Sequence, residues 1–327
     1  MEKYPIAASS LEKFYGIDGK QFERQYKEHL SDYNEWDQLD HADKWLIFPE
    51  NMGPHLSIDE TALSDGELYT IVTNKDAKGK KGALVAIVAG TASEVVYTVL
   101  WKIAEELRYA VEEITLDLSH SMSIIARLAF PNAIQVRDRF HVQKLAIEAL
   151  QDMRVDFRWD AIRQDNALMA YAKSAGVPYQ PEVFENGDTV KQLLARSRYL
   201  LFKTRNNWSA SQKKRAEILF NRYPDLETAY NLVDGLRRIY MSSKTAAGAR
   251  PKLALWYNKV EQAGYDSFKV LAETIRQHNK EILNFFINRS TNASAESFNA
   301  KIKNFRAQLR GVTDVKFFLY RLAKIYA

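Results

Sequence analysis

The sequence predicts an α/β fold in which a small mixed sheet is interrupted by a large all-helical block. Two observations lead to this prediction. Short runs rich in Val, Ile and Thr, separated by glycines, fill residues 55–90 and are typical of strands joined by turns. Residues 143–283, in contrast, have helical periodicity almost throughout.

The elements follow in order from these patterns. Residues 1–54 are polar with little periodicity, and we expect a small, partly helical lead-in. The three antiparallel strands predicted next occupy residues 55–63, 66–74 and 82–90. Residues 91–113 then predict one amphipathic helix.

A second strand–helix–strand series follows. We predict a strand over 114–119, a short helix that Pro131 stops, and a strand over 133–142. Within the helical block, residues 171–190 contain glycines and prolines and are expected to form a loop.

The predicted segments are therefore 1–54, 55–142, 143–283 and 284–327. Three strands, then helix, strand, helix, strand and a late helix is the element order of the ribonuclease-H-like fold. A fold alone does not give a function.

Composition excludes several classes of site. The chain is 46% hydrophobic and 27% charged, as in soluble globular proteins. It contains no cysteine, which excludes disulfides, thiolate zinc sites and cysteine nucleophiles. The N-terminus has no apolar segment typical of a signal peptide, and the longest apolar run, residues 83–90, is too short to span a membrane. We expect a cytoplasmic, nucleoid-associated protein without a membrane partner.

Charge is unevenly distributed in a chain whose formal net charge is +5. Residues 1–60 are acidic on balance, whereas residues 289–327 carry eight bases against Glu296 and Asp314. A basic block of this kind suggests contact with nucleic acid. An ordinary basic terminus that binds nothing is an equally open interpretation.

Three carboxylates lie at informative places. Asp59 is inside the first predicted strand, Asp117 ends the fourth, and Glu296 opens the late helix. A carboxylate in an apolar strand is costly unless it is paired or bound to metal. Together the three could hold two Mg²⁺ ions, with Mn²⁺ as a substitute, for phosphodiester chemistry. Individually, each also has a structural interpretation: a turn pair, a strand-end residue, and a first-turn acid facing the helix dipole.

Several runs carry a resemblance to a known family. They are IDETAL, LYTIVTN, ITLDLSHSM, FPNAIQVRDRFHVQKLAIEALQDMR and the N-x-x-x-E-x-x-N-x-x-I-K arrangement of 292–303. Over about residues 55–322, the chain resembles the DDE transposases of bacterial insertion sequences, in the group called ISL-three. The resemblance implies that Asp59, Asp117 and Glu296 are the metal-binding catalytic triad. It also implies cleavage at transposon terminal repeats, strand transfer into target DNA, and work as a homo-oligomer.

One feature departs from the family pattern. Its members usually carry an N-terminal cysteine-rich zinc module and a helix-turn-helix, and this chain has no cysteine. Recognition of the element ends by a separate N-terminal DNA-binding protein would explain the difference.

Supporting roles are predicted around the triad. Asp138 could assist the metal pocket or hold Arg139, and His141 could contact phosphate, although a strand-end network is the favoured interpretation of His141. Asn292 is the expected cap of the late helix, and Asn299 belongs to the motif described above.

Two groups of residues are predicted to bind DNA by phosphate contacts and base stacking. They are Lys301, Lys303, Arg306 and Arg310 of the late helix, and Arg205, Trp208 and Lys213 of the helical block. For the second group, an ordinary solvated face with a half-buried Trp is equally open.

Two other functions stay open at this point. One is a catalytically silent DNA-binding or assembly subunit derived from a transposase, which the intact acids at 59, 117 and 296 argue against. The other is a ribonuclease-H-like nuclease or resolvase, which would cleave without terminal-repeat specificity.

Overall fold

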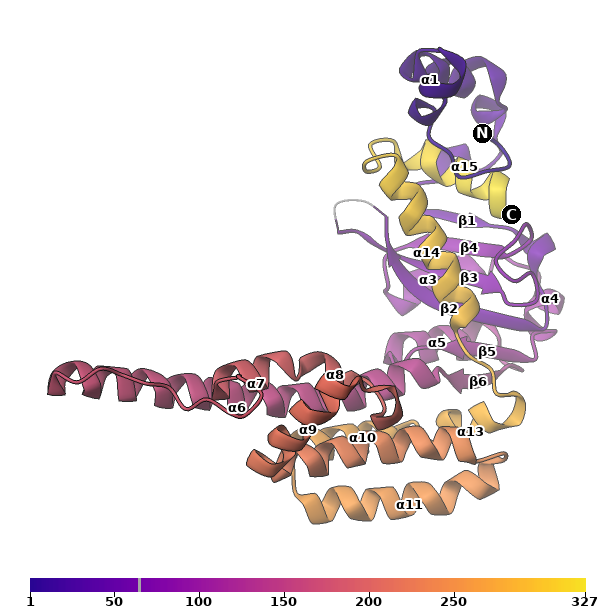
Figure 1. The fold of residues 1–327 in the computed structure, drawn as a ribbon. Coiled ribbons are helices and arrows are strands. Elements are labelled where there is room, and N and C mark those ends of the chain that lie inside the picture. Colours follow the sequence, from indigo (N-terminus) through magenta and orange to yellow (C-terminus); the bar gives the residue numbers. More distant parts are fainter. Residues whose placement is uncertain (64–65) are drawn as a thin grey trace. The chain divides into compact units, whose positions relative to one another are not determined.

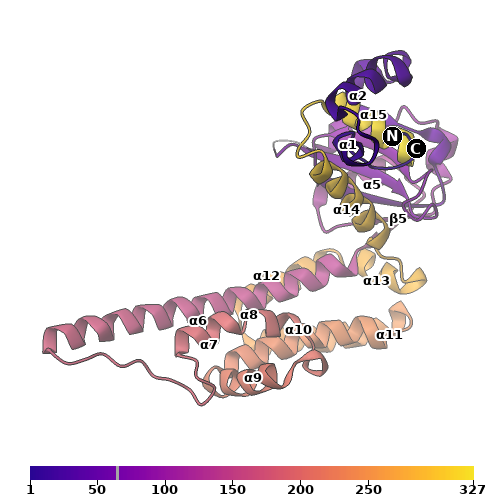
Figure 2. The ribbon, with the colours of Figure 1, turned by 45° about the horizontal axis from the view of Figure 1, so that its top comes forward.

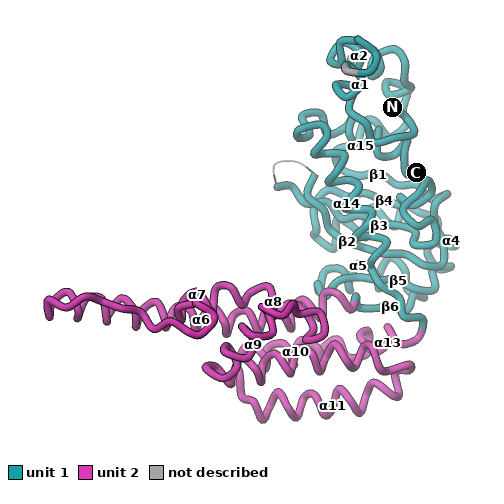
Figure 3. Tube along the Cα trace, viewed as in Figure 1, with its two compact units in different colours: residues 1–138, 288–327 teal, residues 139–287 magenta. Residues whose placement is uncertain are grey.

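The computed structural model describes residues 1–63 and 66–327, with only the backbone at Lys13. The chain forms two compact units, coloured separately in Figure 3. Unit 1 comprises residues 1–138 and 288–327, and unit 2 comprises residues 139–287. These boundaries lie beside the predicted segment boundaries at 142/143 and 283/284.

Unit 1 is built around one six-stranded mixed sheet (Figure 1). Its strands are β1 (Trp45–Ile47), β2 (His55–Ala62), β3 (Leu68–Asn74), β4 (Leu84–Ala89), β5 (Glu113–Leu116) and β6 (Ile134–Arg137). Their spatial order is β1-β4-β3-β2-β5-β6. The first four pair antiparallel, and β5 and β6 run parallel to β2.

The predicted mixed sheet is confirmed, but the sequence analysis missed β1. This strand has three residues, pairs only with β4 among the described strands, and lies at the edge of the sheet. A strand this short cannot show an alternating pattern, and it is surrounded by polar residues. Residues 1–54 therefore supply part of the sheet as well as a helical lead-in.

Two predicted boundaries are wrong. The fifth predicted strand ends at Arg137, and α6 (Arg139–Ala175) begins two residues later, so Arg139 and His141 are helical. Val and Phe near a helix start look like strand residues in a short window. The helix predicted over 91–113 is divided into α3 (Ser93–Leu100) and α4 (Glu105–Tyr109) by an intervening turn.

Helices cover both faces of the sheet. Buried side chains of α3 and α5 (His120–Ala129) pack on one face, in a cluster with Leu56, Val72 and Val85. On the other face lie α14 (Ala293–Gln308) and α15 (Val315–Tyr326), whose side chains pack with Ile71 and Ile87. Burial on both faces explains why the strands read as continuous apolar runs and not as alternating ones.

The N-terminal segment packs on α15. Its helices are α1 (Ser9–Tyr15) and α2 (Gly19–Gln25), and the ring of Tyr33 contacts that of Phe317 edge to face, with centroids 5.3 Å apart. Arg321 of α15 is 1% exposed, and its Nη2 donates to the carbonyl oxygens of Met1, Tyr4 and Ile6 at 3.0, 3.3 and 2.9 Å. One guanidinium therefore holds the chain's first residues against the last helix.

We expect Arg321→Met to release this segment. The change keeps an apolar stem but removes the charged donor from three carbonyl groups, which should lower the local free energy of opening by about 2 kcal/mol. Hydrogen exchange of peptides from residues 1–30 measures this loss. The matched variant Arg127→Met, at an exposed position of α5, should leave their exchange unchanged, and equal protection in both variants would contradict the assignment.

Unit 2 is entirely helical apart from its connections and one isolated bridge, among the residues described. Its helices are α6, α7 (Val190–Arg196), α8 (Arg198–Phe202), α9 (Ala210–Arg222), α10 (Pro224–Ser242), α11 (Ala246–Ala263), α12 (Asp266–Gln277) and α13 (Asn279–Asn288), the last reaching into unit 1 by one residue. The predicted all-helical insertion is thus confirmed. In Figure 1 and Figure 2, the far end of α6 extends beyond the other helices of this unit.

The loop predicted over 171–190 is shorter than expected, because α6 continues to Ala175 and α7 starts at Val190. No helix in the described parts of the chain is long and apolar enough to cross a membrane.

Candidate active site

Strand register brings two of the predicted acids to one level of the sheet. Ser57 of β2 pairs with Thr115 of β5 in parallel. Asp59 lies two residues after Ser57, and Asp117 lies two residues after Thr115. The two segments are neighbours and run in the same direction where they pair. Asp117 comes directly after the end of β5, and its Oδ1 accepts the Ser119 N–H at 2.7 Å.

The electrostatics of Glu60 agree with this placement. Burial raises the pKa of Glu60, and the neighbouring carboxylates of Asp117 and Asp59 raise it further. Asp59 Oδ1 accepts the backbone N–H of Glu60 at 2.9 Å. Negative charge is therefore concentrated where β2 passes the end of β5, a setting that favours a cation.

Helix α14 brings the third acid to the same strand. Asn299 is 6% exposed, and its Nδ2 donates to Asp59 Oδ2 at 2.7 Å. Glu296 lies three residues earlier, and residues at this spacing are neighbours on a helix surface. Farther along α14, Arg306 Nη1 donates to the carbonyl oxygen of Ala62 at 3.1 Å. The helix thus lies along β2.

The start of α14 is anchored by polar contacts. Asn292 occupies the cap position, but its side chain makes no cap hydrogen bond. Its Oδ1 instead accepts a hydrogen bond from the Ser57 hydroxyl, and its backbone N–H donates to Asp138 Oδ1 at 3.3 Å. Asn292, Ser57 and Asp138 are all buried. These contacts fix the helix turn that carries Glu296 against β2 and the end of β6.

The return from unit 2 is held by a second buried acid. Glu113 of β5 is 3% exposed and accepts from Lys75 Nζ at 3.1 Å and from Asn288 Nδ2 at 3.2 Å. Burial acts to raise the pKa of Glu113, but hydrogen bonds from Ser290 and Lys75 outweigh it, so the pKa lies below its ordinary value. Glu113 therefore serves as a charged anchor for the segment before α14.

Sequence reasoning missed Arg137, the last residue of β6. Its side chain is fully buried, and Nη1 donates to the carbonyl oxygens of Asp117 and Ser119, the latter at 3.3 Å. Nη2 donates to the Ser123 hydroxyl. Arg137 thus fixes the backbone that carries Asp117. The available signal was a base at the end of an apolar strand, directly before Asp138.

Asp59 and Asp117 lie near one stretch of β2, and Glu296 is carried by the helix that lies along it, but the three acids are not assembled into a finished metal site. Among the residues that the structure describes, no group of three or more His, Asp or Glu side chains is placed to hold a metal ion. The donor chemistry nevertheless fits a hard divalent cation, because the groups gathered here are carboxylates. Burial is the largest cause of the raised pKa of Glu60, and the further contributions of Asp117 and Asp59 show that these two carboxylates lie near it.

The predicted supporting residues divide between the units. Asp138 is 1% exposed in unit 1, and its backbone N–H donates to the Leu116 carbonyl at 2.9 Å, in a strand-end network. Arg139 and His141 belong to α6 in unit 2. The Arg139 guanidinium lies 5.9 Å from the centre of the Phe285 ring.

The basic residues of α14 also differ in their surroundings. Lys301 Nζ donates to the Gly79 carbonyl oxygen at 2.6 Å, and Arg306 is bound to β2 as described. Both thus have structural contacts within unit 1. Lys303 is exposed, and so is Arg310, which the sequence placed in the late helix but which lies two residues beyond the end of α14.

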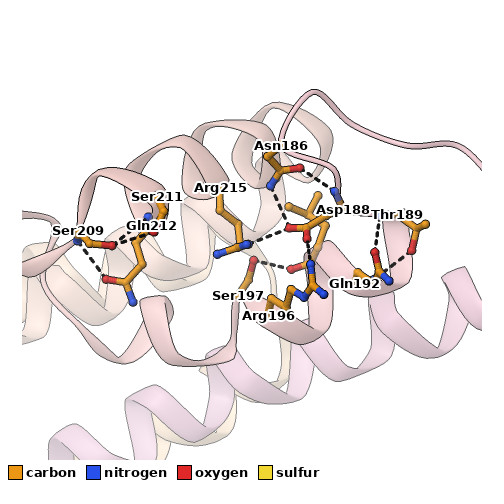
Figure 4. A network of polar contacts seen from close by, with 11 residues as sticks. Asn186, Asp188, Thr189, Gln192, Arg196, Ser197, Ser209, Ser211, Gln212 and Arg215 are labelled. Atoms are coloured by element: carbon orange, nitrogen blue, oxygen red, sulfur yellow. Dashed lines mark hydrogen bonds and ion pairs between the residues drawn. The ribbon is translucent and has the colours of Figure 1, made fainter.

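Two arginines of unit 2 form ion pairs with one buried acid (Figure 4). Asp188 is fully buried and forms ion pairs with Arg196 and with Arg215, whose Nε lies 2.8 Å from Asp188 Oδ2. Asn186 Nδ2 donates to the same carboxylate at 2.9 Å. Burial opposes the charge of Asp188, but its bonds to Arg215 and Arg196 outweigh burial and hold its pKa below the ordinary value. These bases therefore stabilise the fold of unit 2.

The stacking role predicted for Trp208 is corrected by its burial. Trp208 is 9% exposed, its Nε1 donates to the Leu200 carbonyl at 2.8 Å, and its ring packs near Phe220 and Tyr230. A nucleic-acid base cannot stack on an indole enclosed in this way. Arg205 lies over the same aromatic cluster and pairs with Glu227 at 2.8 Å. Lys213 is exposed.

Comparison with known proteins matches this chain to transposases. The sequence profile of the ISL3 family of DDE transposases, described as "Transposase", matches residues 56–322. The chain is also 24% identical over 269 residues to the "Transposase for insertion sequence element IS1001" of Bordetella parapertussis. That match covers 82% of this chain and 60% of the relative, so the chain spans less than two thirds of that protein's length. This chain belongs to the ISL3 family of DDE transposases.

Proposed function

We propose that the chain is the polynucleotidyl transferase of an insertion sequence, cleaving DNA strands at the element ends and joining them to target DNA. Family membership supports this function. The observation that supports it most is the parallel pairing of Ser57 in β2 with Thr115 in β5, each two residues before a predicted acid. The hydrogen bond from Asn299, on the Glu296-bearing helix, to Asp59 adds to this support.

The proposed roles follow from the contacts. Asp59, Asp117 and Glu296 would hold two Mg²⁺ ions, or Mn²⁺ in their place. Bound metal ions of this kind supply activation of the attacking oxygen and stabilisation of the leaving oxygen. Asn299 orients the Asp59 carboxylate, and Arg137 holds the peptide of Asp117.

Contacts with the DNA substrate are proposed for the exposed basic side chains. Lys303 and Arg310 would bind phosphates of the terminal repeat or of target DNA beside the acids. We expect a homo-oligomer acting on paired element ends, and recognition of the repeat by a separate DNA-binding protein.

The test is cleavage and joining of a labelled duplex that carries the flanking terminal repeat. Mg²⁺-dependent nicks and joined products that EDTA abolishes are expected, and in the presence of the separate DNA-binding protein a scrambled repeat should reduce both. Binding without cleavage under every metal condition would instead support an assembly subunit. Cleavage that ignores the repeat and gives no joined product would support a nuclease or resolvase.

Asn299→Ala is expected to weaken catalysis without unfolding the chain. Loss of the hydrogen bond to Asp59 should lower apparent metal affinity or the rate by about 10- to 100-fold, as for other residues that orient metal ligands. Single-turnover nicking across a Mg²⁺ titration measures the change. The control is Asn304→Ala at an exposed position of the same helix. Equal Mg²⁺ curves for both variants would remove Asn299 from this role.

A further inference from the structure

A groove lies within unit 2 between α10 and α11, outside the site described above. The two helices form a hairpin connected by residues 243–245, and they lie side by side in Figure 1. The groove has a volume of about 640 Å³. Neither group of bases singled out from the sequence as DNA-binding lines it.

The charge of this groove is one-sided. Arg238, Lys252 and Lys259 line it, and no acidic side chain is among the described residues that do so. Arg238 and Lys259 are exposed, and Lys252 Nζ donates to the Ser242 hydroxyl at 2.9 Å. Asp234 partly offsets the charge of Arg238 from outside the groove, with 3.2 Å between Asp234 Oδ2 and Arg238 Nε. The cations still outnumber the acids.

The floor of the groove offers no aromatic surface for stacking. Trp256 is 3% exposed, and its Nε1 donates to the Leu232 carbonyl oxygen at 2.9 Å. On the facing helix, Gly235 has no side chain, and a Cβ there would lie 3.5 Å from Trp256 Cδ1. A ligand of this groove therefore meets cations, neutral donors such as the amides of Asn231 and Gln262, and the exposed apolar side chain of Leu255.

We propose that the α10–α11 groove binds the phosphate backbone of duplex DNA without reading sequence. Lys and Arg side chains that contact only phosphates do not distinguish one nucleotide sequence from another. A groove without an accessible aromatic ring also does not favour the unpaired nucleobases of single-stranded DNA. The choice of DNA over another polyanion rests on the proposed function. The groove supplies affinity for DNA that does not depend on its sequence.

The test is the salt dependence of DNA binding by the full chain. Binding of a labelled duplex of arbitrary sequence is measured by anisotropy in EDTA, over a KCl series, for the wild type and for Arg238→Gln/Lys252→Gln/Lys259→Gln. Each phosphate contact contributes about 0.9 to the slope of log K against log[KCl], so the variant should be shallower by about 2 to 3. The control, Lys3→Gln/Lys20→Gln/Lys173→Gln, makes the same charge change at exposed lysines outside the groove, and it should keep more of the wild-type slope.

Thermal unfolding of both triple variants establishes that they are folded. Equal slopes for the groove variant and the control would overturn the proposal. A groove variant that loses binding to polyglutamate but keeps duplex binding would also overturn it and point to an acidic protein. Because EDTA prevents metal-dependent cleavage, this result is independent of the proposed activity. A wild type that cleaves nothing, but whose DNA binding depends on the groove, would refute the activity alone.

Discussion

Replacing Asp117 by asparagine is expected to lower the rate of Mg²⁺-dependent strand cleavage on the order of 10³-fold, about 4 kcal/mol of transition-state stabilisation. Asparagine has nearly the same shape and can still accept the Ser119 N–H that Asp117 Oδ1 binds at 2.7 Å. The loss would therefore come from the missing charge and not from a changed backbone. Single-turnover cleavage of the terminal-repeat duplex measures it.

Asp59→Asn and Glu296→Gln should show losses of the same order, because the three acids are proposed to act as a unit. The matched control is Glu112→Gln, a charge removal at an exposed position beside β5, which should stay within about threefold of wild type. DNA binding in EDTA should persist in every variant. Cleavage by Asp117→Asn at the control rate would show that the metal ions are held by other residues.

Removing the charge of Asp188 is expected to produce the largest loss of stability in unit 2. Asp188→Asn leaves Arg196 and Arg215 facing a neutral group, in place of a fully buried carboxylate that pairs with both. Breaking a buried ion pair costs about 3–5 kcal/mol, and we expect about 3 because Arg196 stays partly solvated. Hydrogen exchange of α7 and α9 peptides reports this loss locally.

The same acid should make unit 2 sensitive to low pH. The pKa of Asp188 is lowered in the folded chain from its ordinary value of 3.8. The unfolded state therefore binds its proton first as the pH falls. The stabilisation is complete above about pH 3.8 and is lost as the pH falls through the lower folded-state pKa.

Chemical denaturation between pH 2 and pH 7 tests this dependence. Asp188→Asn should be less stable at pH 7 and lose less stability on acidification than the wild type. Asp152→Asn, at an exposed position of α6, should follow the wild type at every pH. Parallel pH curves for Asp188→Asn and the wild type would mean that Asp188 is not the titrating group.

Local patterns in the sequence predicted most of the sheet. The strands β2, β3 and β4 are apolar runs bounded by glycines or polar turns, and such signals are contained within each segment. The edge strand β1 was missed because three residues show no distinctive period. The start of α6 was assigned to a strand because Phe140 and Val142 look like strand residues in a short window.

The side-chain roles were less predictable than the elements. Arg137 and Ser57 were missed, since their importance depends on partners distant in the chain, Asp117 and Asn292. The role of Trp208 stayed open between base stacking and a half-buried position for the same reason: a basic neighbourhood looks like a nucleic-acid surface until the packing of Phe220 and Tyr230 around the indole is seen.

The sequence by itself determined the α/β class, the helical insertion, the family, and the acids at 59, 117 and 296 as candidates. These conclusions depend on periodicity, composition and residue identity, which are properties of short segments. Only the tertiary structure decided that Ser57 and Thr115, each two residues before a predicted acid, pair on parallel strands, that Asn299 of α14 bonds to Asp59, and that Arg196 and Arg215 pair with Asp188. Register, burial and pairing arise when distant segments pack together, so no local pattern records them.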